Sequence, residues 1–519
     1  MNLSLLLDMT RDGLGDRILL GSRHDGISGE DLHRRSVGGA RALRQSGATA
    51  VIYVGANATA FPVAMFAAAK AGVPLVPLNY RLGDEQLGQL IRHHPGALAV
   101  TDPGQLQRVR QTGVDTITTG QWLARTAELA GDVIDPPETQ PETAIIIYTS
   151  GTTAAPKGVV IKHSNLLSYV FGSVEFGVAD AAEAALVSVP PYHIAAVANA
   201  ITNLYAGRRT VPMGQFTPEQ WLSAARDEQI TNAMVVPTML ARIMSAPGDL
   251  RVPSLRTVAY GGAATPLPVI ERALRAWPNV DFVNAYGLTE TSSTIAILSP
   301  EDHRTAIAAD DPAVRARLTS VGHVVPSIEL QIRDEDGAVI TDRRPGRVFV
   351  RGDQVSGHYT SSGSVLGPDG FFDTRDVGHL DAHGYLFIDG RADDTIIRGG
   401  ENIAPAEIEN VLLAHPDVID AIVVGIPDEE WGQHLEAAVA LRTGATATGQ
   451  TLREHVRSRL RTSKTPDRIH IWDELPRTET GKLVRRDAVK RITAGPRPPR
   501  LGPPRSEMTG PRMSDGRVG

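Results

Sequence analysis

The chain has 519 residues, enough for two or three domains and a large buried core. Its 52 basic and 59 acidic residues give a net charge of −7, so we expect no nucleic-acid partner and no general attraction to an anionic membrane. It contains no cysteine, which excludes disulfides, thiolate metal sites and a cysteine nucleophile. Any thiol chemistry must therefore use a thiol that a substrate brings in.

The first ten residues, MNLSLLLDMT, lack the basic start, the long apolar stretch and the small-residue cleavage site of a signal peptide. No apolar run approaches the roughly 20 residues that a membrane-spanning helix needs. We therefore expect a soluble enzyme of the cytoplasm without a transmembrane segment.

Short apolar runs rich in β-branched residues alternate with helical patterns through the first 390 residues. The strand-like runs include Ala50–Tyr53, Ala144–Tyr148, Ala185–Val189 and Ala233–Val236, and the helical patterns include Phe61–Ala71 and Pro218–Asp227. Strands without strict alternation that are separated by helices indicate sheets covered on both faces. The pattern predicts an α/β fold whose large N-terminal domain, residues 1–390, consists of sheets flanked by helices.

A second compact pattern starts after the turn and short strand of HLDAHGYLFIDG, near Asp393. It consists of the strand-like IIR, a glycine-rich turn, a helix with Pro405 in its first turn, the strand Ala421–Ile426 and the basic helix Leu452–Arg461. In the first of these helices, Ile408, Val411 and Leu412 share one face. This pattern predicts a small mobile α+β C-terminal domain over residues 391–494. Residues 495–519 are crowded with Pro, Gly and Arg, and we expect a disordered tail there.

The segment Thr149–Gly158, TSGTTAAPKG, follows a predicted strand and holds four hydroxyls, two glycines and one lysine. Hydroxyls and backbone N–H groups can surround a polyphosphate, and lysine adds a compact positive charge. The segment is not a Walker A loop. It resembles the phosphate-binding signature of the adenylate-forming (AMP-binding) superfamily, in its acyl-CoA synthetase and fatty-acid–CoA ligase branch, and the resemblance spans residues 10–494. The positions it assigns to the nucleotide are Thr149, Ser150, Gly151, Thr152, Thr153 and Lys157.

Further motifs follow in the order found in that superfamily. In Tyr260–Ala264 (YGGAA), the resemblance places Gly261, Gly262 and Ala263 beside the adenine. In Asn284–Glu290 (NAYGLTE), it places Ala285, Tyr286 and Gly287 at the nucleotide, Thr289 on phosphate and Glu290 on Mg²⁺. A flat ring, a hydroxyl and a hard carboxylate oxygen suit these roles.

The string FDTRD, which ends at Asp376, resembles the superfamily's Thr-Gly-Asp element, whose aspartate binds the ribose hydroxyls. Arg391 matches a second ribose contact, and Asp393 matches the hinge about which the small domain turns between half-reactions. Arg375 stands where the family usually has glycine, and this departure leaves the shape of the loop open. Taken alone, Asp393 could equally be a solvated loop charge.

The small domain carries the positions that the resemblance links to thiol transfer and to catalysis. Gly399 and Gly400, in GGENIAPAEIE, match the lining of a tunnel for the pantetheine arm of coenzyme A (CoA), and Trp431 matches a loop on the nucleotide side of CoA ligases. Lys482, in PRTETGK, matches the lysine that bridges the substrate carboxylate and the α-phosphate. The resemblance thus implies that Lys482, Thr289 and Glu290 are catalytic.

The pair Tyr192–His193 stands where the acid pocket of the superfamily begins. Amino-acid-activating members have an aspartate there, because a buried ammonium group needs an anionic partner. Its absence favours a simple carboxylic acid, and nearby small residues leave room for an alkyl chain, although helix packing explains them equally well. We expect a hydrophobic, fatty acid and a role in fatty-acid metabolism. His193 either faces the substrate or is a structural histidine.

The resemblance implies ATP and CoA as co-substrates, with Mg²⁺. The basic run from Arg453 to Arg468 could attract the phosphates of CoA, but it could also be a solvated helix face. Two other functions stay open. The enzyme could load a phosphopantetheinyl acyl carrier protein instead of CoA, or the chain could be a nucleotide-binding regulator without catalysis.

Overall fold

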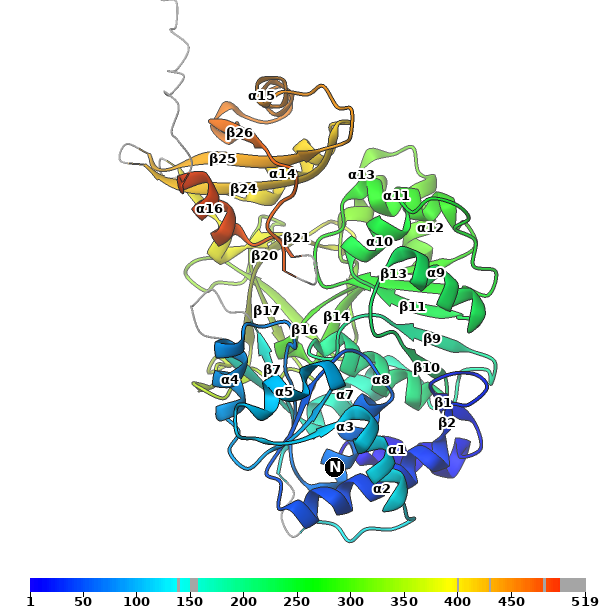
Figure 1. Ribbon diagram of the computed structural model, residues 1–519. Helices are drawn as coiled ribbons and strands as arrows, with labels where there is room; N and C mark the ends of the chain where they lie inside the picture. The colour runs from blue at the N-terminus through cyan, green and yellow to red at the C-terminus, as the bar shows by residue number, and fades with distance from the viewer. Residues whose placement is uncertain (138–140, 150–156, 399–400, 429–430, 479–481, 495–519) are drawn as a thin grey trace, which may run out of the picture.

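The computed structural model describes residues 1–137, 141–149, 157–398, 401–428, 431–478 and 482–494 (Figure 1). A large N-terminal part contains three sheets, two of which have helices packed on them, and a smaller C-terminal part contains a further sheet with its own helices. The α/β fold class with a large and a small domain is confirmed. We propose residue 390 as the boundary, since strand β21 ends at Arg391 and strand β22 begins at Ile396.

The first sheet of the large part has the order β19-β18-β8-β7-β4-β3-β5-β6. Its strands are β3 (Val51–Val54), β4 (Leu75–Pro77), β5 (Leu98–Thr101), β6 (Asp115–Thr118), β7 (Thr143–Thr149), β8 (Lys157–Lys162), β18 (His358–Tyr359) and β19 (Gly363–Ser364). Strands β3 to β7 pair in parallel, whereas β8, β18 and β19 extend the sheet in antiparallel fashion. The sheet therefore ends in an antiparallel edge built from two distant stretches of chain.

The second sheet has the order β15-β14-β13-β12-β11-β9-β10-β1-β2. Its strands are β1 (Ile18–Leu20), β2 (Ile27–Ser28), β9 (Ala184–Val187), β10 (Arg209–Pro212), β11 (Asn232–Val235), β12 (Thr257–Gly261), β13 (Asp281–Leu288), β14 (Ser293–Leu298) and β15 (His323–Val324). The central strands from β10 to β13 are parallel. The carboxyl ends of β12 and β13 therefore lie side by side, where the predicted adenine motifs are.

The third sheet is antiparallel, with the order β16-β17-β20-β21, and its strands are β16 (Glu329–Arg333), β17 (Gly346–Arg351), β20 (Phe372–Leu380) and β21 (Leu386–Arg391). The sheet of the small part has the order β23-β22-β25-β24, with β26 pairing β25. Its strands are β22 (Ile396–Arg398), β23 (Glu401–Ile403), β24 (Val418–Asp428), β25 (Gly432–Leu441) and β26 (Arg468–Ile471). The small part lies over the ends of β20 and β21 (Figure 1).

The helices of the large part are α1 (Ser4–Leu14), α2 (Gly29–Ser46), α3 (Ala60–Ala71), α4 (Asp84–Arg92), α5 (Leu106–Arg110), α6 (Thr119–Glu128), α7 (His163–Ser173), α8 (Ile194–Ala206), α9 (Pro218–Asp227), α10 (Pro237–Ile243), α11 (Leu267–Ala276), α12 (Pro300–Ala308) and α13 (Pro312–Ala316). Those of the small part are α14 (Pro405–Leu413), α15 (Gly449–Arg457) and α16 (Arg485–Ala494). Among the described residues, no helix is both long and apolar enough to cross a membrane. The cytoplasmic location stays a prediction.

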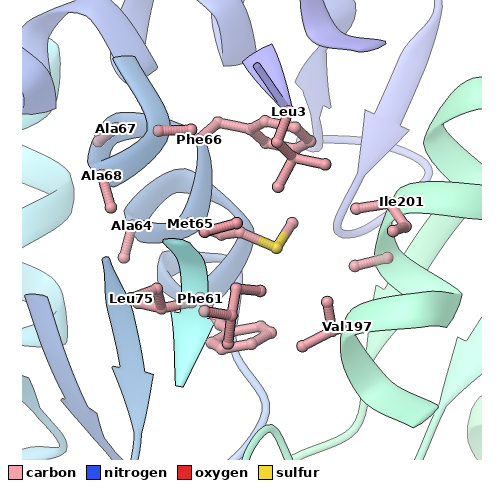
Figure 2. Close-up of a cluster of buried hydrophobic side chains, with 14 of the residues drawn as sticks. Leu3, Phe61, Ala64, Met65, Phe66, Ala67, Ala68, Leu75, Val197 and Ile201 are labelled. Carbon is pink, nitrogen blue, oxygen red and sulfur yellow. The ribbon is translucent and has the colours of Figure 1, made fainter. Parts of the chain in front are cut away.

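Helix α3 is apolar all round and buried on every side, as expected for a helix without a polar face. Figure 2 shows Phe61, Met65 and Phe66 of α3 packed toward Val197 and Ile201 of α8. These side chains belong to one core that also contains residues of β3, β7 and β8. The core joins the first sheet to helix α8, and it fixes the framework around the site.

The predicted elements agree with the structure except at some ends. Helix α9 begins and ends where the sequence indicated, because Thr217 caps it and Pro218 suits its first turn. The prediction for Leu452–Arg461 was wrong at both ends. Helix α15 starts at Gly449, since Thr448 and Thr451 form a capping box, and it ends at Arg457. The expected tail, 495–519, lies outside the described residues.

Candidate active site

The hairpin β7–β8 carries the two ends of the predicted phosphate-binding loop. Thr149, the last residue of β7, pairs with Lys157, the first residue of β8. The Thr149 Oγ1 donates a 3.5 Å hydrogen bond to the Lys157 carbonyl oxygen. The predicted loop residues Ser150, Gly151, Thr152 and Thr153 lie outside the described residues. The hairpin fixes Lys157 at the mouth of this loop.

The predicted adenine side is built from backbones that approach closely. Gly261 ends β12 and pairs with Ala285 of β13, and a Cβ on Gly261 would lie 2.1 Å from the Ala285 carbonyl oxygen. A Cβ on Gly287 would lie 1.8 Å from the Ser293 carbonyl oxygen. Gly262 follows with a φ of +84°, and Ala263 comes next. Glycine is therefore required at 261 and 287 for space, and it is favoured at 262 by conformation.

A short 3₁₀ turn, Thr289–Thr291, follows β13 and presents Thr289 and Glu290. The buried Gln354 side chain donates hydrogen bonds to the carbonyl oxygens of Thr291 (3.1 Å) and Thr294 (2.9 Å). The Ser356 N–H donates to the Glu290 carbonyl oxygen at 2.8 Å. Sequence reasoning missed Gln354 and Ser356, because the contacts join segments far apart in the chain. These hydrogen bonds from Gln354 and Ser356 hold the backbone of the turn that carries Glu290.

Asp376 lies at the centre of the predicted ribose site, on β20 opposite Arg391 of β21. Arg391 Nη1 is 2.9 Å from Asp376 Oδ1, and the Tyr286 hydroxyl donates to Asp376 Oδ2 at 2.5 Å. Burial raises the pKa of Asp376, while Arg391 and the Tyr286 hydrogen bond lower it. Burial and the Asp376 charge raise the pKa of Tyr286. The predicted adenine and ribose residues thus form one bonded group.

Lys482 comes from the small part and precedes α16. Thr478 holds the Lys482 backbone, since the Thr478 N–H donates to the Lys482 carbonyl oxygen (2.7 Å) and the Thr478 Oγ1 accepts from the Lys482 N–H (3.0 Å). Lys482 is exposed as a residue, although protein atoms surround its ammonium group. Burial of the ammonium lowers the pKa of Lys482, and the charge of Arg391 lowers it further. The charges of Asp376 and Glu290 raise this pKa, but by less. The Lys482 charge therefore acts within the same site as these three groups.

The predicted acid-pocket residues also meet this site. His193 precedes α8, and burial followed by the Lys482 charge lowers the pKa of His193 to about 4. Its Nε2 is buried and has no hydrogen-bond partner among the described residues. The Tyr192 ring lies 4.6 Å from that of His193 and makes an edge-on contact with Tyr80, which sequence reasoning missed. A neutral, unpartnered imidazole nitrogen near Lys482 favours the substrate-facing role for His193.

Two consecutive aspartates occupy the junction between the parts, in the 3₁₀ turn Ala392–Asp394. Arg375 Nη1 lies 3.2 Å from Asp393 Oδ2, and Arg485 Nε lies 3.2 Å from Asp394 Oδ2. Neither carboxylate is thus only a solvated loop charge. Arg375 has a φ of +61°, which explains why the family usually has glycine at this position.

The predicted CoA positions lie at an edge of the small sheet. Trp431 is about half exposed and directly precedes Gly432, which pairs with Arg398 of β22. The predicted tunnel residues Gly399 and Gly400 follow Arg398 in sequence and lie outside the described residues.

Glu290 suits a magnesium ion that arrives with a polyphosphate. Within the part of the chain that the structure describes, no group of three His, Asp or Glu side chains could hold a metal ion by itself. Mg²⁺ is usually bound by one or two carboxylates together with phosphate oxygens and water. A single carboxylate at Glu290, close to Lys157 and the phosphate-loop hairpin, fits that pattern.

Comparison with known families extends over most of the chain. Residues 10–360 match the family described as AMP-binding enzyme, and residues 407–482 match the AMP-binding enzyme C-terminal domain. The indoleacetate–CoA ligase of Aromatoleum aromaticum is 32% identical over 480 residues, which cover 88% of this chain and 91% of that protein. The fatty acid–[acyl-carrier-protein] ligase ScoC of Streptomyces coeruleorubidus is 32% identical over 481 residues, covering 88% and 90%.

A solved structure with the same fold is that of o-succinylbenzoate CoA synthetase (MenE) from Bacillus subtilis in complex with its acyl-adenylate intermediate. It superposes with a TM-score of 0.79 and 26% sequence identity over 96% of this chain and 99% of that chain. The likeness includes both the large and the small part, since nearly the whole of each chain is covered.

Proposed function

The chain belongs to the AMP-binding enzyme family, and on that premise we propose that it is an acid–CoA ligase that releases AMP and pyrophosphate. AMP-binding CoA ligases use ATP, Mg²⁺ and CoA. The observation that carries the proposal is the hydrogen-bonded group of Tyr286, Asp376 and Arg391 in the large part. The charges of Asp376 and Arg391 also act on Lys482 of the small part. A nucleotide-binding regulator without catalysis would need the nucleotide residues, but it would not need Lys482 of the small part.

In the first half-reaction, a carboxylate oxygen of the acid attacks the α-phosphorus of ATP, and the bond to the β-phosphate oxygen breaks. Asp376 and Arg391 orient the ribose, and Lys482 neutralises the charge that develops between the carboxylate and the α-phosphate. Lys157 binds the departing pyrophosphate, and Glu290 would hold a Mg²⁺ ion that supplies further positive charge for this leaving group. The product is an acyl-adenylate, a mixed anhydride that the site must keep from water.

In the second half-reaction, the CoA thiol attacks the acyl carbon, and AMP leaves. The small part would turn about Asp393, remove Lys482 from the site and bring the edge with Trp431 toward it. The thiol belongs to the substrate, and no covalent enzyme intermediate is needed. This agrees with a chain that has no cysteine.

For the acid, we propose a hydrophobic carboxylic acid, with a fatty acid as the specific substrate. The support is the neutral His193 beside the packed rings of Tyr192 and Tyr80, a group without a carboxylate. Relatives named for indoleacetate and for fatty acids are equally similar to this chain, so aryl acids belong in the same test. A screen of CoA-thioester formation across alkyl and aryl acids decides between them.

The acceptor has two candidates, because one relative is named for an acyl carrier protein. We favour CoA, for which Trp431 supplies an exposed aromatic face beside the tunnel segment predicted from the sequence. The basic run gives weaker support, since Arg453 is engaged with the Pro466 carbonyl oxygen. AMP release with free CoA, compared with release in the presence of a phosphopantetheinyl carrier, identifies the acceptor.

Lys482→Ala tests the assignment. We expect acid-dependent exchange of pyrophosphate into ATP to fall about 100- to 1,000-fold, the usual loss when one stabilising donor is removed from a transition state. Thioester formation from pre-made acyl-adenylate should change little, because its leaving group is already formed. Lys490→Ala, on an exposed lysine of α16, is the matched control.

Equal losses in the two half-reactions would contradict the role of Lys482. The reaction type itself would be wrong if the wild-type protein, given ATP and acid, released ADP and orthophosphate instead of AMP and pyrophosphate.

A further inference from the structure

Tyr359 lies between two groups of opposite charge. Its hydroxyl donates a 2.7 Å hydrogen bond to Glu290 Oε1, and the centre of its ring lies 5.8 Å from the Lys157 ammonium nitrogen. It belongs to β18, which pairs with β8 through Tyr359 and Val159. No motif in the sequence pointed to this residue. It nevertheless contacts both groups that were assigned to the metal and to the pyrophosphate.

The backbone around Tyr359 fixes its position. The Thr360 N–H donates to the Gly158 carbonyl oxygen at 2.8 Å, which ties the residue after Tyr359 to the strand that carries Lys157. The Ser356 N–H bonds the Glu290 carbonyl oxygen, which ties the same segment to the turn that carries Glu290. A Cβ on Gly158 would lie 2.8 Å from Thr360 Oγ1, so little space is left for this strand to shift.

Lys157 and Glu290 would be expected to pair if nothing stood between them, because lysine has a long, flexible side chain. No ion pair joins these two described residues. Instead, one carboxylate oxygen accepts the tyrosine hydroxyl, and the ammonium faces the aromatic ring. A hydrogen bond to a carboxylate is stronger than a typical exposed ion pair. The Lys157 ammonium, 5.8 Å from the centre of a partly buried ring, lies near the outer limit of a cation–π contact and is held only weakly. The carboxylate is therefore fixed, while the ammonium can leave the ring for a phosphate.

We propose that Tyr359 is a positioning residue that keeps Glu290 and Lys157 apart and ready to bind the metal and pyrophosphate end of MgATP. This inference rests on the proposed function of the site. The hydroxyl engages Oε1 and leaves Oε2 for the ion, as an outer hydrogen bond orients a metal-ligating carboxylate. The ring prevents an ion pair that would have to be broken before ATP could bind.

The inference distinguishes ATP from AMP. AMP has neither a β- nor a γ-phosphate, so its binding depends on the adenine and ribose residues and not on Glu290 or Lys157. Removing the hydroxyl should weaken the binding of MgATP and raise the Mg²⁺ concentration needed for it. The affinity for AMP should stay unchanged.

The test uses full-length Tyr359→Phe and Tyr359→Leu, with calorimetric titration of ATP at several Mg²⁺ concentrations and of AMP without metal. We expect Tyr359→Phe to weaken MgATP binding about tenfold, in the range usual for lost outer-shell contacts, and Tyr359→Leu to weaken it further. Tyr385→Phe is the matched control, because the Tyr385 hydroxyl donates to Asp302 at 2.6 Å, in a similar tyrosine–carboxylate contact between residues not assigned to the site.

The proposal is overturned if Tyr359→Phe binds MgATP as the wild type does, if ATP and AMP affinities fall together, or if Tyr385→Phe shows the same loss. Thermal unfolding of each variant distinguishes lost positioning from lost folding. A failure of the proposed function has a different signature. A wild-type protein that binds MgATP but activates no acid would refute the ligase activity, while the positioning role of Tyr359 would stand.

Discussion

The two neighbouring aspartates at the junction, Asp393 and Asp394, are held in opposite ways. Asp393 pairs with Arg375 of the large part, and these side chains are 34% and 51% exposed. Asp394 pairs with Arg485 of the small part, whose guanidinium also binds the buried Glu409 and the Val423 carbonyl oxygen. One side of the junction is thus a single surface ion pair. On the other side Asp394 is equally exposed, at 34%, but its arginine is also held by the buried Glu409.

The difference indicates where the molecule can bend. A surface ion pair stabilises a structure by about 0–1 kcal/mol, whereas removing one partner of a buried pair costs about 3–5 kcal/mol. A rotation between these residues would break the Asp393 pair at small cost and leave the Asp394 network intact. The comparison therefore supports the proposed hinge at Asp393 and assigns Asp394 to the rigid small part.

The largest expected effect on stability comes from removing Arg485, which pairs with Asp394 and with the buried Glu409. Arg485→Met leaves Glu409 buried without its cation, and we expect a loss of about 3 kcal/mol in the stability of the small part. Hydrogen exchange of α14 and β24 measures this loss as faster exchange. Arg486→Met, on an exposed neighbour, is the control. If hydrogen-exchange protection falls equally in Arg485→Met and Arg486→Met, the contacts on the Asp394 side of the junction are not the stronger ones.

Lowering the pH provides a second test of the stability of the small part, with a smaller expected effect. Burial raises the pKa of Glu436, but hydrogen bonds from His434 and His470 outweigh it and lower the pKa from 4.5 to about 2. A lowered carboxyl pKa stabilises the fold above pH 4.5, and this stability is lost as the pH falls from 4.5 toward 2. We expect Glu436→Gln to remove about 1–3 kcal/mol of pH-dependent stability in this range. Hydrogen exchange of β25 at matched pH checks it, and equal pH slopes in both proteins would count against it.

The smallest effect on stability should come from breaking the surface ion pair between Asp393 and Arg375. Asp393→Asn removes the ion pair with Arg375, and we expect a loss of stability below about 1 kcal/mol. The population of the rotated arrangement should rise by at most about fivefold. Because the chain has no cysteine, the two labels for an energy-transfer measurement can be placed uniquely with Glu219→Cys and Gln450→Cys. A change in adenylation but none in the transfer efficiency would refute the hinge.

Much of the fold could be predicted, because local signals and tertiary structure agree there. Helix α9 has its cap and its proline in sequence, and β7 is an apolar run with turn residues after it. The start of α15 was missed because Thr448 lies four residues before the first apolar position, Leu452, in a polar stretch that resembles a loop.

The site was predictable where residues belong to ordered strings and not where contacts join distant segments. Glu290, Asp376 and Lys482 each lie in a motif. Tyr359 lies on a two-residue strand whose partner is far away in sequence, and Arg375 contacts Asp393 only through the pairing of β20 with β21. Neither contact has a signal in the sequence around it.

The close backbone approach at Gly261 and Gly287 has a practical consequence for anyone who wishes to change the acid preference. Saturation libraries at these two positions should yield almost only misfolded proteins, because even an alanine methyl would overlap a carbonyl oxygen. Diversity is better placed at Ala263 and at Ala195, which lies on α8 two residues after His193, because both positions already carry a Cβ. Ala263 follows β12 and Ala195 lies on α8, so the two positions can be varied independently.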